Sequence, residues 1–339
     1  MPVLVTGATG FVGAALTRRL VADGREVHVL VRDAQSAALP DLAKAAVHLG
    51  SLADPNQLAQ AASGCEALIH CAAECSSLAS NQTLGWTNVA GTENVLRAAR
   101  HSGCQRLVMV SCADVTLINA PRVHWSENRK LSEQPAGLHA RSKLLAEELA
   151  LCASSKTLGV TALRPAILWG PGDNHLLPEL CRTARHNGMS LAGSGRNLVS
   201  TTYIDNLVHA IIATLAAAPQ AVEGKAYYIT DDEFLESAEF FGMLCESAGL
   251  PLPRRGSYLI AYAGACVRQW LLKDPASRAE VIRRGRSYHF DIGASLTDFG
   301  YRPQTSVGDG MRAVHAWVNE VGGPEIVARR LRSVPVEPQ

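Results

Sequence analysis

The sequence lacks the features of a membrane-spanning, metal-binding or nucleic-acid-binding protein. No stretch reaches the ~18 uncharged apolar residues needed to cross a bilayer. The 32 lysines and arginines nearly balance the 31 aspartates and glutamates, so a net charge of +1 gives no electrostatic reason to expect nucleic acid. The nine cysteines are scattered without paired metal spacing, and His175 and His186 have no ligand companions. We therefore expect no metal, reduced thiols, no targeting segment and a cytoplasmic protein.

The longest nearly apolar stretch is Ser257–Leu272, which Arg268 and Gln269 interrupt. We favour a core helix here, and the alternative is an amphipathic helix that lies on a surface. Aromatic residues are also scarce, at 5% of the chain, and no tyrosine precedes Tyr203. That absence excludes a tyrosine proton donor from the first 202 residues.

A glycine-rich turn is the most informative feature that is present. Thr6–Gly13 reads Thr-Gly-Ala-Thr-Gly-Phe-Val-Gly, after the apolar run Val3–Val5 and before the helically spaced Ala14–Leu20. A strand, a glycine turn and a helix in this order form a phosphate cradle, because glycines let the backbone approach the pyrophosphate. Strand-like and helix-like segments alternate through the first half, at Glu26–Arg32, Leu68–Ala73, Gln105–Ser111 and Gly159–Arg164 among others. This alternation predicts an α/β fold, a Rossmann-type doubly wound parallel sheet with a smaller C-terminal α/β subdomain.

The spacing of Gly7, Gly10 and Gly13 resembles that of the short-chain dehydrogenase/reductase superfamily. The amino-acid sequence of the turn resembles that of the extended branch of this superfamily. Further matching segments are His70–Ala73, Asn88–Val95, Arg164–Asp173, Gly193–Asn197, Thr202–Asn206, Gly224–Asp231 and Phe299–Pro303. Together they look most like the 3β-hydroxysteroid dehydrogenase/isomerase group. The resemblance implies a dinucleotide-binding domain over residues 1–165 and a substrate-binding subdomain over 166–320 that partly crosses back to the core. Residues 321–339 are expected to form a C-terminal extension.

The end of the predicted second strand bears on the choice of cofactor. NAD-binding members hold the adenosine 2′-hydroxyl with an acidic residue there, whereas this chain has Val31 followed by Arg32, with Asp33 one residue late. An arginine suits a 2′-phosphate, so we expect NADP rather than NAD; the alternative is a solvated arginine.

The resemblance also implies site residues. For the cofactor they are Gly7, Thr9, Gly10, Phe11, Val12, Gly13, Arg32, Ser51, Leu52, Cys71, Ala72, Ala73, Asn88, Val110, Lys143, Pro165, Ile167 and Leu168. For the substrate they are Cys75, Ala113, Trp125, Asn174 and His175. Ser51 stands where relatives often carry an aspartate. The segment 124–127, which contains Trp125, either lines the substrate pocket or is a surface loop.

The expected catalytic residues depart from the family pattern. The family uses a Tyr-x-x-x-Lys pair, with a serine or threonine just beyond the fifth strand. Here His139 and Lys143 form the pair, on one face of a helix, and Cys112 takes the serine position. We expect Cys112 and His139 to face each other across the nicotinamide pocket. His139 would be a base whose pKa the Lys143 ammonium lowers, and Cys112 a candidate thiolate.

Three functions remain open. The first is an NADP-dependent oxidoreductase that acts on a hydroxyl or ketone of a hydrophobic or alicyclic small molecule, with His139 as acid/base. Few aromatic residues and no basic cluster argue against a sugar nucleotide. The second is a non-redox isomerase, lyase or cyclase that uses His139 or Cys112, and the third is a nucleotide-binding protein without catalysis. The resemblance implies a homodimer, formed by the helices that carry Asn88 and His139.

Overall fold

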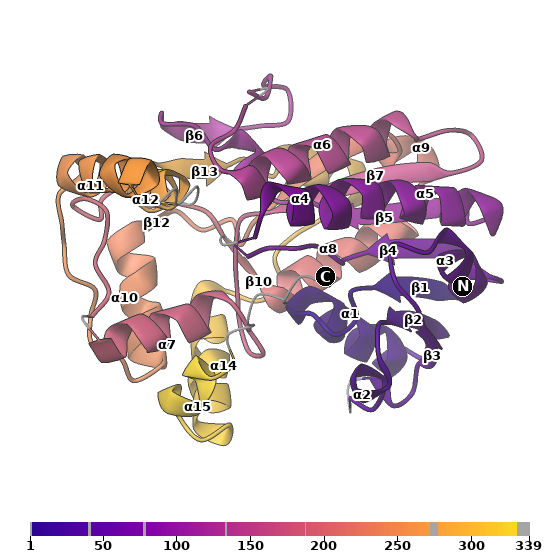
Figure 1. The fold of residues 1–339 in the computed structure, drawn as a ribbon, viewed down its shortest axis with the longest axis horizontal. Coiled ribbons are helices and arrows are strands. Elements are labelled where there is room, and N and C mark those ends of the chain that lie inside the picture. Colours follow the sequence, from indigo (N-terminus) through magenta and orange to yellow (C-terminus); the bar gives the residue numbers. More distant parts are fainter. Residues whose placement is uncertain are drawn as a thin grey trace.

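A seven-stranded parallel sheet in the order β11-β7-β5-β4-β1-β2-β3 organises the chain (Figure 1). The structure is a computed structural model that describes residues 2–39, 42–76, 79–132, 134–186, 188–271 and 277–330. The sheet strands are β1 (Val3–Thr6), β2 (Val27–Val31), β3 (Ala46–Leu49), β4 (Ala67–His70), β5 (Arg106–Val110), β7 (Gly159–Pro165) and β11 (Lys225–Ile229). The doubly wound parallel sheet expected from the sequence is confirmed.

Helices cover both faces of this sheet because its strands alternate between two apolar cores. In β1, Val3 and Val5 pack in the core with α1 (Phe11–Ala22) and α8 (Ile204–Ala216), while Leu4 packs in the opposite core. That second core lies under α3 (Pro55–Ala62), α5 (Gly91–His101) and α6 (Leu138–Cys152). Three short helical segments connect these elements: α2 (Ala34–Ala37), α4 (Asn81–Leu84) and the π-helical η2 (Gly85–Ala90).

The substrate-side part contains two small sheets. One has the strand order β12-β9-β13-β6 and the other pairs β10 with β8. Their strands are β6 (Arg122–Trp125), β8 (Ile167–Trp169), β9 (Leu198–Val199), β10 (Thr201–Tyr203), β12 (Leu235–Glu236) and β13 (Tyr288–Phe290). His124 and Trp125, for which the sequence suggested a pocket segment or a surface loop, belong to the end of β6, which pairs with the distant β13. The predicted domain boundary at residue 165 stays a prediction. The chain crosses between the two parts on both sides of it, since β6 precedes it and joins a small sheet, whereas β11 follows it and joins the large sheet.

The remaining helices are η3 (a 3₁₀ turn, Ala113–Thr116), α7 (Leu176–His186), α9 (Pro219–Val222), α10 (Ser237–Ser247), α11 (Tyr258–Leu271), α12 (Ser277–Gly285), α13 (Gly293–Phe299), α14 (Val307–Glu320) and α15 (Pro324–Ala328). They pack around the small sheets, except that α9 and α13 lie against the β7 and β11 strands of the large sheet. Val327 of α15 is fully buried, so the start of the expected C-terminal extension packs on the core; residues 331–339 lie outside the described residues.

The expectation of a core helix over Ser257–Leu272 is wrong for the described part of that stretch. Helix α11 buries Ala265 and exposes Leu259, Ile260 and Trp270 to at least 75%. Apolar residues occur on every side of this helix, so periodicity could not show which side meets the core. Among the described residues, no helix combines the length and apolar character required to span a membrane.

Candidate active site

The glycine-rich turn has the shape of a phosphate cradle. Gly7 has φ of +72°, and a Cβ there would lie 2.6 Å from the backbone of Ala72. A Cβ on Gly13 would lie 2.2 Å from the Gly7 carbonyl oxygen. Side chains are therefore excluded where the β1–α1 turn meets the end of β4, and the first N–H groups of α1 open onto this space. These residues fit the pyrophosphate of a dinucleotide.

At the adenosine end, the structure separates the roles of Arg32 and Asp33. The Asp33 carboxylate caps α2, accepting from the Ser36 N–H at 2.7 Å and the Ser36 hydroxyl at 3.0 Å. These bonds lower the pKa of Asp33. Arg32 directly follows β2 and is exposed. The acid next to the strand end is thus engaged with its own helix, and the guanidinium is available to solvent or to a phosphate.

Ser51 and Leu52 lie beyond β3, at the same adenosine end of the site. The Ser51 N–H donates to Gln57 Oε1 at 3.0 Å, and its hydroxyl accepts from the Ala53 N–H at 3.2 Å. The Leu52 carbonyl accepts from Asn94 at 2.9 Å. Hydrogen bonds to Gln57 of α3 and Asn94 of α5 thereby hold this turn in place.

His70, which the sequence analysis left without a role, ties the cradle to α5. It is buried between the Thr6 hydroxyl at 2.8 Å and the Thr92 hydroxyl at 3.1 Å. Because Thr92 donates its own proton to the Asn88 carbonyl, it accepts from His70 Nε2–H, and Thr6 donates to Nδ1. Burial lowers the pKa of His70 to about 3, so the ring is neutral. This bridge fixes the end of β4, from which Cys71, Ala72 and Ala73 pass beside the glycine turn.

The side chain of Asn88 holds the wall of the site in place. Its amide group is engaged in hydrogen bonds and does not point freely into the site. The π-helical η2 places this side chain inward, where its Oδ1 accepts from the Glu74 N–H at 2.8 Å. Its Nδ2 donates to the Glu74 carbonyl at 3.0 Å and to the Ser142 hydroxyl at 2.9 Å. Asn88 therefore locks the segment at Glu74 against α6.

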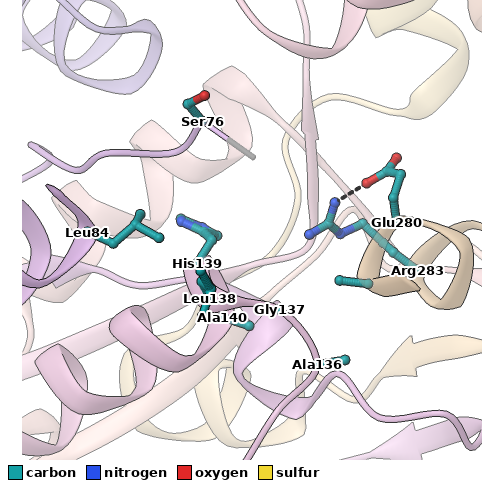
Figure 2. A pocket seen from close by; sticks show the side chains of 10 residues that line it. Ser76, Leu84, Ala136, Gly137, Leu138, His139, Ala140, Glu280 and Arg283 are labelled. Atoms are coloured by element: carbon teal, nitrogen blue, oxygen red, sulfur yellow. Dashed lines mark hydrogen bonds and ion pairs between the residues drawn. The ribbon is translucent and has the colours of Figure 1, made fainter. Parts of the chain in front are cut away.

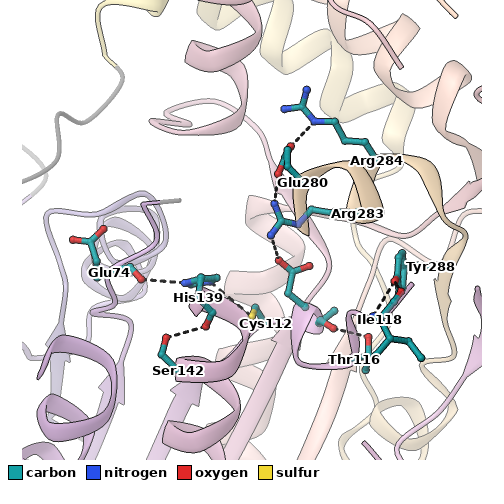
Figure 3. A network of polar contacts seen from close by, with 12 residues as sticks. Glu74, Cys112, Thr116, Ile118, His139, Ser142, Glu280, Arg283, Arg284 and Tyr288 are labelled. Atoms are coloured by element: carbon teal, nitrogen blue, oxygen red, sulfur yellow. Dashed lines mark hydrogen bonds and ion pairs between the residues drawn. The ribbon is translucent and has the colours of Figure 1, made fainter. Parts of the chain in front are cut away.

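The three predicted catalytic residues meet at the carboxyl edge of the sheet, and Figure 3 shows two of them, His139 and Cys112. His139 Nε2 lies 4.0 Å from the Cys112 Sγ, and Lys143 Nζ donates to the Val110 carbonyl at 2.7 Å. His139 Nδ1 lies 3.1 Å from the Glu74 carbonyl oxygen, which can only accept. The neutral ring therefore carries its proton on Nδ1, and the lone pair of Nε2 faces Cys112.

Burial governs the protonation of both groups. It lowers the pKa of His139 to about 4, and the cationic Lys143 and Arg283 act in the same direction, while Asp114 and the Glu74 carbonyl oppose it. The pKa of His139 is lowered, as the sequence analysis expected, but burial contributes more to this shift than the Lys143 ammonium does. Burial also raises the pKa of the Cys112 thiol to about 12. Cys112 is thus a neutral thiol near pH 7, so the expected thiolate is not supported.

A chain of charged residues beside His139 was not foreseen (Figure 3). Arg283 of α12 pairs with Asp114 at 2.7 Å and with Glu280 at 2.5 Å, and Glu280 also pairs with Arg284. Within the described part of the chain, the buried Nε of Arg283 has no hydrogen-bond partner. Asp114 lies two residues after Cys112, but the sequence carried no local signal that α12 would reach it.

Two cavities adjoin this charged chain, and Arg283 lines both. The first, with about 380 Å³ of empty space, is bounded by Ser76, Leu84, Ala136, Gly137, Leu138, His139, Ala140, Ala279, Glu280 and Arg283 (Figure 2). The second, with about 340 Å³ of empty space that is partly open to solvent, is bounded by Ala113, Asp114, Leu117, Ala166, Ile167, Val199, Ser200, Arg283, Tyr288 and Phe290. Apart from the charged chain, most of these walls are apolar.

The predicted substrate residues are distributed unevenly around these cavities. Ala113 lines the second one, together with Ile167, which the sequence analysis assigned to the cofactor. Trp125 is 9% exposed and packs in the core beside it, with the Arg122 guanidinium 3.8 Å from its ring centroid. Asn174 and His175 precede α7 and do not line either cavity, and Cys75 is likewise absent from both linings. Pro165 ends β7 and Leu168 lies in β8, next to Ile167.

A buried ion pair supports α6 from behind. Arg164 at the end of β7 donates to Glu147 of α6 at 2.5 and 3.1 Å, and both side chains are at most 7% exposed. Glu147 lies one helical turn from Lys143, so the pair fixes the rotation of the helix that carries His139 and Lys143.

Comparisons with known proteins identify the family of this chain. Residues 4–258 match the model of the 3-beta hydroxysteroid dehydrogenase/isomerase family. A 2-alkyl-3-oxoalkanoate reductase of Stenotrophomonas maltophilia is 35% identical, over 93% of this chain and 99% of the relative. The human decarboxylating sterol-4-alpha-carboxylate 3-dehydrogenase is 29% identical, over 74% of this chain and 67% of its own. Among solved structures, a dTDP-glucose 4,6-dehydratase of Streptomyces venezuelae with NAD and TYD bound superposes with a TM-score of 0.74 at 26% identity, covering 94% of this chain and 97% of that one.

The Rossmann-type sheet, the glycine cradle and the retained lysine define an extended short-chain dehydrogenase/reductase with an atypical residue at the catalytic tyrosine position. Its homologues are oxidoreductases, and structural neighbours bind NAD. The chain belongs to the 3-beta hydroxysteroid dehydrogenase/isomerase family.

Proposed function

We propose that the protein is an NADP-dependent oxidoreductase that interconverts a hydroxyl and a ketone on a hydrophobic or alicyclic small molecule, with His139 as the acid/base. The observation that carries this proposal is the orientation of His139. The Glu74 carbonyl holds the Nδ1 proton, so Nε2 presents a lone pair on the side of Cys112. A nitrogen with an available lone pair and a defined tautomer is what proton abstraction from an alcohol requires.

In the oxidation direction, the substrate O–H proton passes to His139 Nε2 as the oxygen forms its carbonyl double bond. When bound, the nicotinamide ring supplies the hydride-accepting carbon, and the electron pair of the substrate C–H bond leaves with that hydrogen. The imidazolium that forms is held by the Glu74 carbonyl and stabilised by Asp114. Lys143, anchored to Val110, would hold the nicotinamide ribose, as the family resemblance implies. Reduction is the same sequence in reverse.

The substrate class is supported by the cavities and by the relatives. Both cavities have mostly apolar walls, which favour hydrophobic ligands. The relatives are named as a reductase of 2-alkyl-3-oxoalkanoates and a dehydrogenase of sterol-4-alpha-carboxylates. In both names, the oxo or hydroxyl function belongs to an alkyl-substituted or alicyclic molecule.

Cofactor absorbance tests the reaction. We expect NADPH consumption with some members of a panel of alkyl and alicyclic ketones, a loss of turnover in His139→Phe, and NADP binding that stays nearly intact. His139→Tyr is expected to recover a reductase profile if a phenol can replace the imidazole. If His139→Phe keeps full activity, the acid/base assignment is wrong. If wild type binds cofactor but converts no ketone or alcohol in the panel, the non-redox or non-catalytic alternative is preferred.

The NADP preference is supported by the exposed Arg32 and by the engagement of Asp33 with α2. Losing a charge-assisted contact to a phosphate costs about 1.5–3 kcal/mol, so Arg32→Ala should weaken NADP binding about 10- to 150-fold and leave NAD binding unchanged. Arg97→Ala, which removes an exposed arginine from α5, is the control. Equal affinity of wild type for the two cofactors, or no effect of Arg32→Ala, would contradict the assignment.

We also propose a homodimer through α6 and the α4–η2–α5 segment. Leu145 of α6 is 55% exposed and Trp86 of η2 is 67% exposed, whereas the neighbouring Leu144 faces the core. Apolar side chains of this size on two adjacent helices suit a two-fold four-helix contact.

A further inference from the structure

The two cavities with mostly apolar walls meet at one guanidinium group. Arg283 lines both of them, Glu280 lines the cavity beside His139, and Asp114 lines the other. The two ends of the guanidinium bind these carboxylates, Nη1 to Glu280 at 2.5 Å and Nη2 to Asp114 at 2.7 Å. Resting on the proposed function, we propose that Arg283 is a specificity-determining residue. It divides the substrate space into two compartments and thereby limits the length of the alkyl chain that a ketone substrate can carry.

The apolar walls of the two cavities belong to one packed cluster of side chains. Ala136 and Ala279 line the cavity beside His139 and pack in this cluster. The cluster also contains residues that line the second cavity: Ala113, Leu117, Ala166, Tyr288 and Phe290. An alkyl chain that runs from one cavity to the other therefore meets apolar surface at both ends and charge at the boundary that the cavities share.

Further ion pairs hold Arg283 at this boundary. Glu280 also pairs with Arg284, and Arg284 pairs with Glu179 of α7 at 3.1 Å. Figure 3 shows Arg283 and Arg284 on either side of Glu280. A guanidinium that is bound at both ends, by carboxylates that are themselves held, keeps one position.

The remaining hydration of this pair opposes the passage of an alkyl chain. The side chains of Arg283 and Asp114 are 32% and 27% exposed, so water still reaches them. A chain that crossed here would remove this water and offer no hydrogen bond in return, which is unfavourable for charged groups. The ion pair therefore acts as a wall between two apolar spaces.

Turnover alone would not identify this role, because Arg283 also lowers the pKa of His139. The binding of an uncharged ketone separates the two effects, since it does not require His139 to gain or lose a proton. A homologous series of unbranched 2-alkanones is therefore titrated into the full chain in a calorimeter. Oxidised NADP is present, so that no ketone is reduced during the measurement.

Chain length gives the readout. Burying one methylene group strengthens binding about fourfold. In the wild type we expect this gain for each added methylene until the cavity beside His139 is filled, and constant affinity for longer chains. Arg283→Met replaces the cation by an apolar side chain. In this variant the gain should continue, so that the longest alkanones bind at least about tenfold more tightly than they bind to wild type. In assays of reduction, the benefit for long chains should appear in KM.

Two more variants control the experiment. Arg284 lies on the same helix and pairs with Glu280, yet it lines neither of the two described cavities, so Arg284→Met should keep the wild-type length limit. The double variant Asp114→Asn/Arg283→Met also removes a carboxylate that the single variant leaves without its cation. It should show the same extended series, including where thermal melts find the single variant unfolded.

Four outcomes would overturn the proposal. These are a wild-type gain without a limit, the same limit in wild type and the folded Arg283 variants, an equal extension in Arg284→Met, or no binding of any alkanone. If the length limit moves as expected but no ketone is reduced, the proposed redox function fails while the division of the binding space stands. If ketones are reduced and the limit does not move, the division fails while the proposed function stands.

Discussion

Changing the pH should affect the two directions of the proposed reaction in opposite ways. Alcohol oxidation requires neutral His139, and ketone reduction requires its protonated form. Burial, reinforced by Lys143 and Arg283, lowers the pKa of this imidazole to about 4. At pH 6 it is then about 99% neutral, whereas an imidazole with the ordinary pKa of ~6.5 would be about 24% neutral.

The rates of oxidation should therefore stay nearly constant between pH 8 and pH 6, instead of falling roughly fourfold as they would with an ordinary histidine. Reduction should rise about tenfold for each pH unit from pH 8 to pH 5, with no plateau near ~6.5. The assay is kcat in each direction at saturating cofactor, corrected for the acid breakdown of NADPH. An inflection near pH 6.5 in either direction would refute the argument from burial.

Two variants test the electrostatic part of this reasoning. Arg283→Gln removes a cation and leaves Asp114 unneutralised, and both changes raise the pKa of His139. The inflection of oxidation should then move to higher pH. Asp114→Asn removes the opposing anion and should move the inflection to lower pH. Shifts in the same direction, or none, would show that this pair does not act on His139.

The same depressed pKa has a consequence for stability. The unfolded chain binds a proton on this histidine below about pH 6.5, while the folded chain resists it until about pH 4. The unfolded state thus holds more protons in this window, so the contribution of neutral His139 is complete above pH 6.5 and is lost as the pH falls toward 4. In His139→Phe, the free energy of unfolding should decline less over this interval.

Three further predictions concern the cradle, the ion pair behind α6 and the dimer. Gly7→Ala should weaken NADP binding more than tenfold in a fluorescence titration, because its Cβ would clash with backbone 2.6 Å away; Gly24→Ala, with a similar φ of +73° but open space, should bind normally. Glu147→Ala should lower the free energy of unfolding in urea by about 3–5 kcal/mol, since it leaves Arg164 buried without its partner, and a loss below about 1 kcal/mol would contradict this. Leu145→Glu should be a monomer in light scattering at micromolar concentration, whereas wild type should be a dimer; a monomeric wild type would refute the interface.

The sequence by itself determined the sheet, the cradle and the placement of His139 and Lys143 on one helix face. Gly7 and Gly13 are informative because a positive φ and a close backbone approach leave no room for a side chain, wherever the rest of the chain lies. The four-residue spacing of His139 and Lys143 puts both on one helix face for the same local reason. Apolar strands that alternate with helical segments likewise predict the parallel sheet, because its inner strands are buried on both faces.

The tertiary structure decided what depends on distant segments. The tautomer of His139 follows from a carbonyl at Glu74, and the charge beside it from Arg283 on a helix far along the chain. Strand β6 exists because β13 pairs with it. Burial, which sets the pKa of both His139 and Cys112, is a property of everything packed around a side chain. The exposure of α11 has the same origin: an apolar helix is a core helix or a surface helix according to what the rest of the fold places against it.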